Sequence, residues 1–211
     1  MAKDIVIHKF GGTSLGDAER ILRAADLLRT ASRTASVVGV ASAMGGVTDL
    51  LLSAARDAER GRLATARKTL AALKSRHEET AAGISHATGK KLSYDASAVA
   101  DLETALSGVA LLREQSPRVV DLISSFGERL SAPLLAAALN AIGTRSVAVD
   151  ARTLLVTDDR HGTATCDRKK SDPKIRRVLT PLLRARTLPI VTGFIARTVK
   201  GETTTLGRSG S

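Results

Sequence analysis

The sequence is poor in cysteine and in aromatic residues, and each shortage excludes something. Its one cysteine, Cys166, cannot form a disulfide within the chain, which favours a reducing compartment. Because aromatics make up only 2 % of the residues, Ala, Leu, Val and Ile must fill the core, and this favours helices packed on a sheet over an all-β sandwich. No uninterrupted apolar run is long enough for a signal peptide or a membrane span. We therefore predict a cytoplasmic protein that does not bind membranes.

Acidic residues are outnumbered by basic ones, and the formal net charge is +11. This excess raises nucleic-acid binding as an alternative function, which predicts salt-dependent binding to DNA. Nucleic-acid-binding domains usually interleave basic and aromatic residues, whereas these basic residues spread over positions 62–76 and 168–186 beside a single Tyr and no Trp. We therefore predict solvated basic helix faces, no nucleic-acid partner, and a positive field that would attract an anionic substrate.

Short apolar, β-branched runs predict the strands of a parallel sheet. Residues 4–9 and 37–42 are each followed by a glycine loop and then by a helical pattern. Residues 144–149 and 188–192 predict two further strands, and residues 174–186 predict a helix between them. Strand, glycine loop and helix in repeated succession are typical of an α/β fold with a parallel sheet.

The remaining segments predict helices and a loop. Residues 50–115 show Ala-, Leu- and Arg-rich helical periodicity with almost no strand signal, which indicates a helical insertion on one side of the sheet. Apolar residues from Val119 to Leu134 mark one face of a single long helix. The tail, residues 193–211, is rich in Thr and Gly and is expected to be a loop. No repeat or linker divides the chain, so we predict one domain over residues 1–211.

The first glycine loop is a candidate phosphate site. Lys9 ends the first predicted strand, and Gly11 and Gly12 follow it, so an ammonium and a backbone free of side chains would share one space. Backbone N–H groups beside a helix start attract phosphate. The loop is not a Walker A motif, because no Gly-Lys-Ser/Thr follows the glycines.

Three further segments carry polar side chains at corresponding places. Residues 41–48 repeat the design of strand and glycine loop, residues 125–131 place Glu128 off the apolar stripe of its helix, and residues 203–211 combine threonines and glycines with Arg208. In a parallel sheet, the loops that follow different strands converge at the carboxyl ends of those strands, where ligands bind. A site there would gather an ammonium, a guanidinium, a carboxylate and several hydroxyls.

These segments, in this order, resemble aspartate kinases of the amino acid kinase family, and the resemblance runs from residue 5 to the last residue. It implies a three-layer αβα sandwich with a mainly parallel sheet. It also implies ATP-dependent phosphorylation of the side-chain carboxylate of L-aspartate, the first step of lysine, threonine and methionine synthesis, with Mg²⁺ bridging the phosphates. The complete protein is expected to be a homo-oligomer. The matching strings are Lys9–Ser14, Ser42–Thr48, Gly127–Ser131, Gly193–Ile195 and Thr203–Ser211.

The resemblance also assigns roles to single residues. Lys9 would meet the transferring phosphoryl group and act as the catalytic residue, with donors from the loop residues Gly11, Gly12 and Ser14 around the phosphates. No protein side chain is assigned to the metal. The substrate aspartate would be bound by Arg208 through a carboxylate, by Glu128 through its ammonium, by the hydroxyls of Ser42 and Thr48, and by Phe194 as a pocket wall.

Each assignment has a structural alternative that the residues alone leave open. Lys9 could face solvent, Glu128 could be a surface carboxylate, and Arg208 could be a loop cation. Thr48 or Asp49 is expected to start a helix, so Thr48 could be only its N-cap. Phe194 could belong to the core. His8 should lie on the opposite sheet face from Lys9, and we predict that the histidines, none of which has a metal-ligand or nucleophile partner, are not catalytic: His8, His77, His86 and His161.

The sequence departs from the family pattern in its last residues. Ser209 stands where the family has a glycine, and Ser211 precedes the aspartate and the adenine-binding segment that family members place next. The 211-residue chain alone is therefore expected to be inactive. Two alternatives stay open: a family member with another substrate, namely acetylglutamate, glutamate or UMP, and a catalytically incomplete fragment that binds aspartate or a partner chain.

Overall fold

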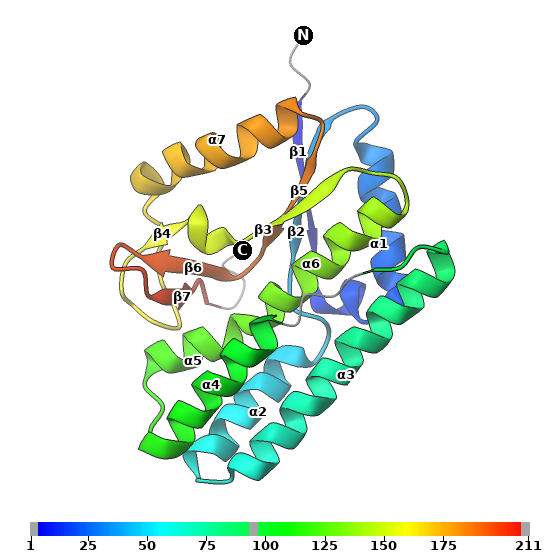
Figure 1. The fold of residues 1–211 in the computed structure, drawn as a ribbon. Coiled ribbons are helices and arrows are strands. Elements are labelled where there is room, and N and C mark those ends of the chain that lie inside the picture. Colours follow the sequence, from blue (N-terminus) through cyan, green and yellow to red (C-terminus); the bar gives the residue numbers. More distant parts are fainter. Residues whose placement is uncertain (1–3, 93–96, 208–211) are drawn as a thin grey trace.

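A parallel four-stranded sheet forms the centre of the computed structural model, which describes residues 4–92 and 97–207 (Figure 1). The strands lie in the order β1-β2-β5-β3, and every pairing is parallel. Phe10, Ala41 and Thr192 lie side by side in the register, so three strands end at the same level. The strands are β1 (Ile5–Phe10), β2 (Ser36–Ala41), β3 (Ser146–Val149) and β5 (Leu188–Thr192).

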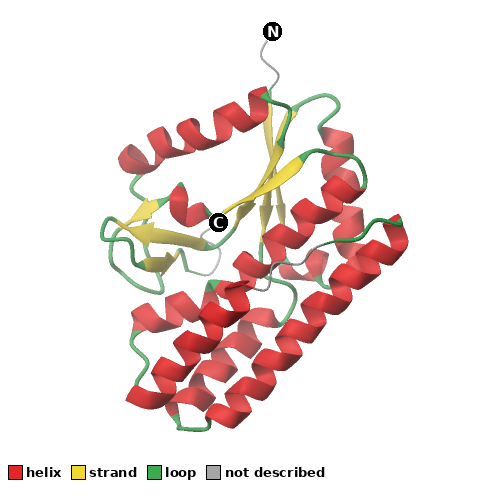
Figure 2. Ribbon diagram, in the orientation of Figure 1, coloured by secondary structure: helices red, strands yellow, loops and turns green. Residues whose placement is uncertain are grey.

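Helices cover both faces of this sheet (Figure 2). The larger core lies on the face of α1 (Ala18–Ala31) and α6 (Phe126–Ala141), whose apolar residues recur at helical spacing. A smaller core lies on the other face under α7 (Arg168–Arg184). The predicted α/β fold with a mainly parallel sheet between helical layers is confirmed. The helix predicted at residues 174–186 begins six residues earlier, where the Asp167 side chain accepts from Lys170 N and caps it.

A bundle of helices lies beyond the carboxyl ends of the strands (Figure 1). Within the described part of residues 50–115 there are helices and no strand, as the sequence predicts. The first of these helices begins at Val47, because the preceding Gly46 adopts φ 78° and ends the loop that follows β2, residues 42–46, the β2 loop. The bundle consists of α2 (Val47–Glu59), α3 (Leu63–Thr88), α4 (Ser97–Leu112) and α5 (Pro117–Ser124).

The single long helix predicted through residues 119–134 is wrong. The chain forms two helices there, α5 and α6, with a turn at Ser125 between them. The Ser124 hydroxyl donates to the Val120 and Asp121 carbonyls, and the Ser125 hydroxyl donates to Leu122. Such hydrogen bonds compete with the helical ladder and bend it. Glu128 consequently lies in the first turn of a new helix.

The prediction of a loop-like tail is also wrong over its described part. Residues 193–207 contribute two strands to a second, three-stranded sheet in the order β4-β6-β7. Strands β6 and β7 are antiparallel, and Gly201 with φ 90° lies in the turn between them. The three strands are β4 (Val156–Thr157), β6 (Ile195–Thr198) and β7 (Thr203–Thr205), and two short 3₁₀ turns complete the fold, η1 (Gly12–Leu15) and η2 (Ala151–Thr153).

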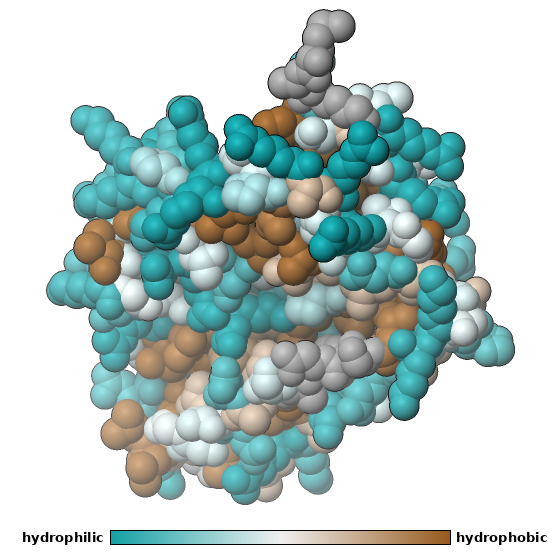
Figure 3. Space-filling view, turned by 45° about the horizontal axis from the view of Figure 1, so that its top comes forward, coloured by the Kyte–Doolittle hydropathy of each residue, from teal (hydrophilic) through white to brown (hydrophobic). Residues whose placement is uncertain are grey.

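On the face shown in Figure 3, hydrophilic side chains are interspersed with patches of apolar surface. Ile5 and Ile7 of the edge strand β1 are 63 % and 66 % exposed. They are two residues apart on the strand, so their side chains lie on the same face of the sheet. Within residues 4–92 and 97–207, no helix is both long and apolar enough to cross a membrane.

Candidate active site

The loop that follows β1, residues 11–17, is the β1 loop. It contacts the β2 loop beyond the ends of the two strands, and these are the two glycine loops predicted from the sequence. A Cβ atom at Gly12 would lie 3.0 Å from the Ala43 carbonyl oxygen and 3.2 Å from Gly45 Cα. A Cβ at Gly45 would in turn lie 3.2 Å from the Gly12 oxygen. Each glycine therefore permits a backbone approach that a side chain would obstruct. The loops form one continuous rim at the carboxyl edge of the sheet.

The β1 loop closes into the 3₁₀ turn η1 and uses one of its predicted donors internally. Ser14 N donates to the Gly11 oxygen at 2.9 Å, so this N–H is occupied, while the Ser14 side chain is exposed. Gly11 is also exposed, and a Cβ there would meet nothing within 4 Å. The structure thus leaves open space beside Gly11 where a ligand could approach the backbone.

Lys9 lies at the end of β1 on the sheet face opposite Phe10. His8 and Phe10 are two residues apart on the strand, and their rings lie 6.5 Å from each other on one face of the sheet. Successive side chains of a strand point to opposite faces, so Lys9 lies on the other face. The prediction that His8 and Lys9 lie on opposite faces is confirmed. Lys9 is exposed, and its ammonium has no hydrogen-bond or ion-pair partner among the described residues. It is available to an anion at this edge.

Glu128 is buried, so the alternative of a surface carboxylate is wrong. Its side chain is only 3 % exposed, and Oε1 accepts a hydrogen bond from Ala43 N in the β2 loop at 3.1 Å. Its other oxygen, Oε2, is buried and has no hydrogen-bond partner among the described residues. A buried polar atom without a partner is costly unless a ligand or water completes it.

Burial also changes the acidity of this group. Desolvation raises the pKa of Glu128 from 4.5 to about 7, and the Ala43 N–H offsets part of that effect. A carboxylate held at such a pKa with one free oxygen is suited to a cationic ligand. Perturbed pKa values of this kind gather at functional sites.

Ser42 and Thr48 flank the same loop and are both half-buried. The Ser131 hydroxyl of α6 donates to the Ser42 carbonyl at 2.6 Å, which ties the helix of Glu128 to the end of β2. Thr48 lies in the first turn of α2, whose N-cap is Gly46. The alternative in which Thr48 is the N-cap is therefore wrong.

Phe194 lies two residues after the end of β5 and adopts a left-handed backbone conformation, with φ 63°. A non-glycine residue held in this region costs of order 1–3 kcal/mol and is often found at functional sites. Gly193 N donates to the Ala41 oxygen at 2.8 Å, which places Phe194 beside the β2 loop. Its half-buried ring packs against the smaller core. The last predicted substrate residue, Arg208, lies outside the described residues.

The threonines expected to offer hydroxyls to a ligand are instead bound within the protein. Thr203, Thr204 and Thr205 are buried in β7, and their hydroxyls bond to Arg152, Thr157 and Asp121 in turn. Sequence reasoning missed this strand because threonine is common both in strands and in loops.

Asp121 of α5 is a buried acceptor that no sequence motif indicated. Its carboxylate is 2 % exposed and accepts from Thr205 Oγ1 at 2.6 Å and from Gly162 N at 2.9 Å. His161 Nδ1 also lies 3.0 Å from Asp121 Oδ2, a partner that the sequence did not indicate. Asp121 thus joins α5, the loop before α7 and the strand that leads toward Arg208.

We predict opposite effects from adding a methyl group at two helical glycines. A Cβ at Gly127 would lie 2.5 Å from Ala43 Cβ, so Gly127→Ala should overpack the buried contact beside Glu128 and destabilise the fold by about 1–3 kcal/mol. Gly108 in α4 has nothing within 4 Å of its Cβ position, so Gly108→Ala should stabilise by about 0.5–1 kcal/mol. Urea unfolding of both variants measures the difference, and equal effects would contradict the packing of α6 on the β2 loop.

Comparison with known proteins shows similarity over nearly the whole chain. A model of the amino acid kinase family matches residues 4–211. Chloroplastic aspartokinase 1 of Arabidopsis thaliana is 34 % identical over 213 residues, covering 97 % of this chain and 36 % of that protein. Lysine-sensitive aspartokinase 3 of Escherichia coli is 33 % identical, covering 99 % of this chain and 44 % of that protein. This chain therefore spans less than half the length of these relatives.

Two solved structures share the fold. The structure of E. coli aspartokinase III in complex with aspartate and ADP aligns with a TM-score of 0.82 at 29 % identity, over 98 % of this chain and 44 % of that chain. The same enzyme in complex with lysine and aspartate aligns with a TM-score of 0.83 at 28 % identity, over 99 % and 44 %. The likeness extends over both sheets and the helical bundle.

Proposed function

This chain belongs to the amino acid kinase family, and from that premise we propose that it takes part in the phosphorylation of the side-chain carboxylate of L-aspartate by Mg-ATP. The observation that carries the proposal is Glu128, a buried carboxylate with one free oxygen at the carboxyl edge of the sheet. The relatives named aspartokinases, and the solved complexes that contain aspartate, support this choice of substrate.

Glu128 also separates the possible substrates by their chemistry. Aspartate and glutamate carry a free ammonium that Glu128 could pair with, whereas acetylglutamate and UMP carry none. Leaving a buried carboxylate unpaired costs several kcal/mol, so a substrate without a cation would be disfavoured. Glutamate is thus the second candidate, and the resemblance of the glycine loops to aspartate kinases favours aspartate.

The remaining polar groups would divide between the two substrates. Ser42 and Thr48 would donate hydroxyl hydrogen bonds to aspartate, Phe194 would line its pocket, and Arg208 would bind a carboxylate through its planar fork. Lys9, with Gly11, Gly12 and Ser14 beside it, would neutralise and orient the phosphates at the transfer point.

Mg-ATP would supply the phosphoryl group, with Mg²⁺ neutralising charge on the phosphates. The open space beside Gly11 and the unpartnered Lys9 ammonium fit a phosphate there. Mg²⁺ usually keeps several waters and binds through phosphates and one or two carboxylates, so it needs no cage of protein side chains. Within the described ranges, no group of three His, Cys, Asp or Glu residues could hold a metal. We propose cytoplasmic action in a homo-oligomer, with the positive charge serving to attract these anions.

The test is binding and turnover with matched ligands. Calorimetry should show that L-aspartate binds the purified protein more tightly than succinate, which has both carboxylates and no ammonium. ADP release by the complete protein should depend on aspartate and exceed that with glutamate, acetylglutamate or UMP. Equal affinity for succinate and aspartate would refute the role of Glu128, and turnover with acetylglutamate or UMP in place of aspartate would refute the substrate.

A further inference from the structure

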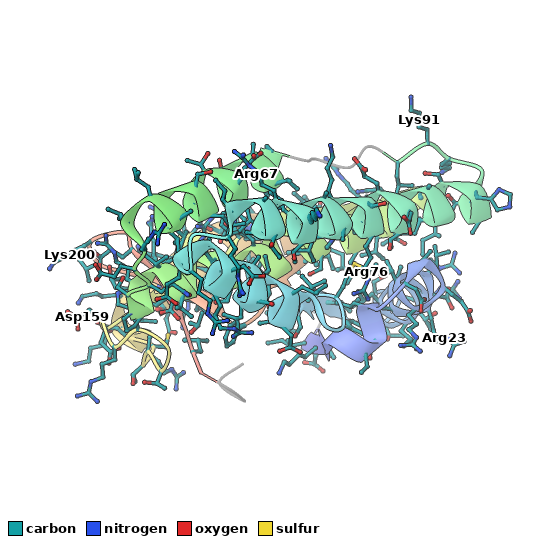
Figure 4. The ribbon with its side chains drawn as sticks, turned by 90° about the horizontal axis from the view of Figure 1, so that it is seen from below. Arg23, Arg67, Arg76, Lys91, Asp159 and Lys200 are labelled. Atoms are coloured by element: carbon teal, nitrogen blue, oxygen red, sulfur yellow. The ribbon has the colours of Figure 1, made fainter. Side chains whose placement is uncertain are left out.

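Arg76 connects the helical bundle to both glycine loops at once. It lies half-buried on α3, and its guanidinium donates through Nη1 to the Gly45 oxygen at 2.8 Å and through Nη2 to the Gly16 oxygen at 3.1 Å. These acceptors belong to the β2 loop and to the end of the β1 loop. Figure 4 shows Arg76 directed toward α1 and the loops, whereas Arg67 of the same helix lies on the opposite side. No sequence motif marks Arg76, which lies 31 and 60 residues from its acceptors.

A hydrogen bond that fixes a carbonyl group also fixes the direction of the N–H group in the same peptide unit. The peptide group is planar and trans, so its C=O and N–H point in opposite directions. The bond to the Gly45 oxygen therefore sets the direction of Gly46 N, the N-cap amide of α2. Arg20 acts similarly on the β1 loop, where its Nη1 donates to the Thr13 oxygen at 2.9 Å. The carbonyl side of both loops is thus held by arginines.

Arginine is suited to this bridge and lysine is not. The guanidinium is planar and offers several donors in a fixed fork, so one side chain can bind two carbonyls in a defined relation. A lysine ammonium is a single point on a flexible stem and cannot reproduce that spacing. Hydrogen bonds from a charged donor are also about twice as strong as neutral ones.

We propose that Arg76 is a positioning residue that sets the spacing of the two glycine loops, and through them the alignment of the two substrates. The inference rests on the proposed function, because these loops lie beside Lys9 on one side and Glu128 on the other. Phosphoryl transfer depends mainly on positioning, and a displacement of about 1 Å can cost about 100-fold in rate. Arg76 donates to backbone carbonyls of both loops and would act through them.

The first test measures the loops directly. Hydrogen–deuterium exchange should be faster in Arg76→Met than in the unaltered chain over residues 10–17 and 43–48, and unchanged over β5. Arg67→Met is the matched control, because Arg67 lies on the same helix and forms only an exposed ion pair with Glu103 at 3.0 Å. Unchanged exchange in both loops would overturn the proposal. If Arg76→Met does not fold, Arg76→Gln replaces it with the same expected result.

The second test separates positioning from a merely structural role. In the complete protein, Arg76→Met should lower kcat about 10- to 100-fold while KM for aspartate changes less than about threefold, and Arg76→Lys should recover only part of the loss. A fall in thermal stability with unchanged kcat below the unfolding temperature would overturn the proposal. If the unaltered protein neither turns over nor binds aspartate, the proposed function fails, and the exchange measurement still decides whether Arg76 holds the loops.

Discussion

In the complete protein, Lys9→Met should lower kcat about 100- to 1,000-fold, comparable to the loss of one preorganised donor at a developing negative charge. Lys9 is exposed at the end of β1 and has no ion-pair partner among the described residues, so its charge is free to act on a phosphate. For the same reason its removal should hardly affect folding, since substitutions at such surface positions usually change stability by less than about 0.5 kcal/mol. Steady-state kinetics with aspartate and Mg-ATP measure the effect.

Lys200→Met is the control for this substitution. Lys200 is an exposed lysine in the turn after β6, and its loss removes the same charge from the protein without touching the glycine loops. It should leave kcat within about twofold, because a distant surface charge alters only the general field, which salt screens. Near-normal turnover of a folded Lys9→Met protein would remove Lys9 from the proposed mechanism.

The main sheet could be predicted from the sequence because its signals are local. Residues 188–192 form an apolar run bounded by polar residues, and the structure places β5 at those residues. β1 and β2 each begin and end within one residue of their predicted bounds. The central strands β2 and β5 are mostly buried, and a parallel strand covered on both faces is a continuous apolar run, so the pattern and the strand coincide there.

The second sheet and the helix break could not be predicted, because each depends on partners distant in sequence or on competing hydrogen bonds. Thr203–Thr205 becomes a strand only because β6 lies beside it, and its hydroxyls find hydrogen-bond partners in segments about 50 to 80 residues away. The break at Ser125 follows from hydroxyl groups that bond backward, a choice that apolar periodicity does not reveal.

Some residues of the candidate site could be predicted from local motifs, and others could not. Motifs indicated Glu128 and the glycine loops, but only the structure shows that Glu128 is buried with one oxygen unpaired. Arg76 and Asp121 carry no local signal, since a basic and an acidic residue on helices are ordinarily solvated. Their roles come from acceptors and donors that tertiary packing brings to them.

Glu128→Gln should reduce the affinity for aspartate by at least about 30-fold and abolish a pH dependence that the unaltered protein shows. Loss of a desolvated charge opposite the substrate ammonium costs about 2–5 kcal/mol. Because the pKa of Glu128 lies at about 7 in the ligand-free fold, the kcat/KM of the complete protein for aspartate should fall about tenfold from pH 8 to pH 6 as the carboxylate is protonated. In Glu128→Gln this profile should be flat, and an unchanged profile would assign the titration to another group.

The same substitution should increase the stability of the fold, by an amount that depends on pH. The pKa of Glu128 is about 7 in the folded chain against 4.5 when unperturbed, so between these values the folded state binds more protons and stability falls as pH rises. Above pH 7 the full cost of an ionised buried carboxylate applies, on the order of 3 kcal/mol. Glu128→Gln should therefore be more stable than the unaltered chain at pH 8, by up to that amount, and about equally stable at pH 4.5.

Denaturant unfolding at pH 4.5 and pH 8 measures this difference, and Glu78→Gln is its control. Glu78 lies on α3 with its side chain 51 % exposed and its nearest cation, Lys74, 3.8 Å away, so neutralising it should change stability by less than about 0.5 kcal/mol at either pH. A gain in stability combined with a loss of aspartate affinity would show that the Glu128 carboxylate destabilises the fold and is needed for binding. Equal stability of Glu128→Gln and the unaltered chain at pH 8 would mean that Glu128 is not held as a buried, desolvated acid.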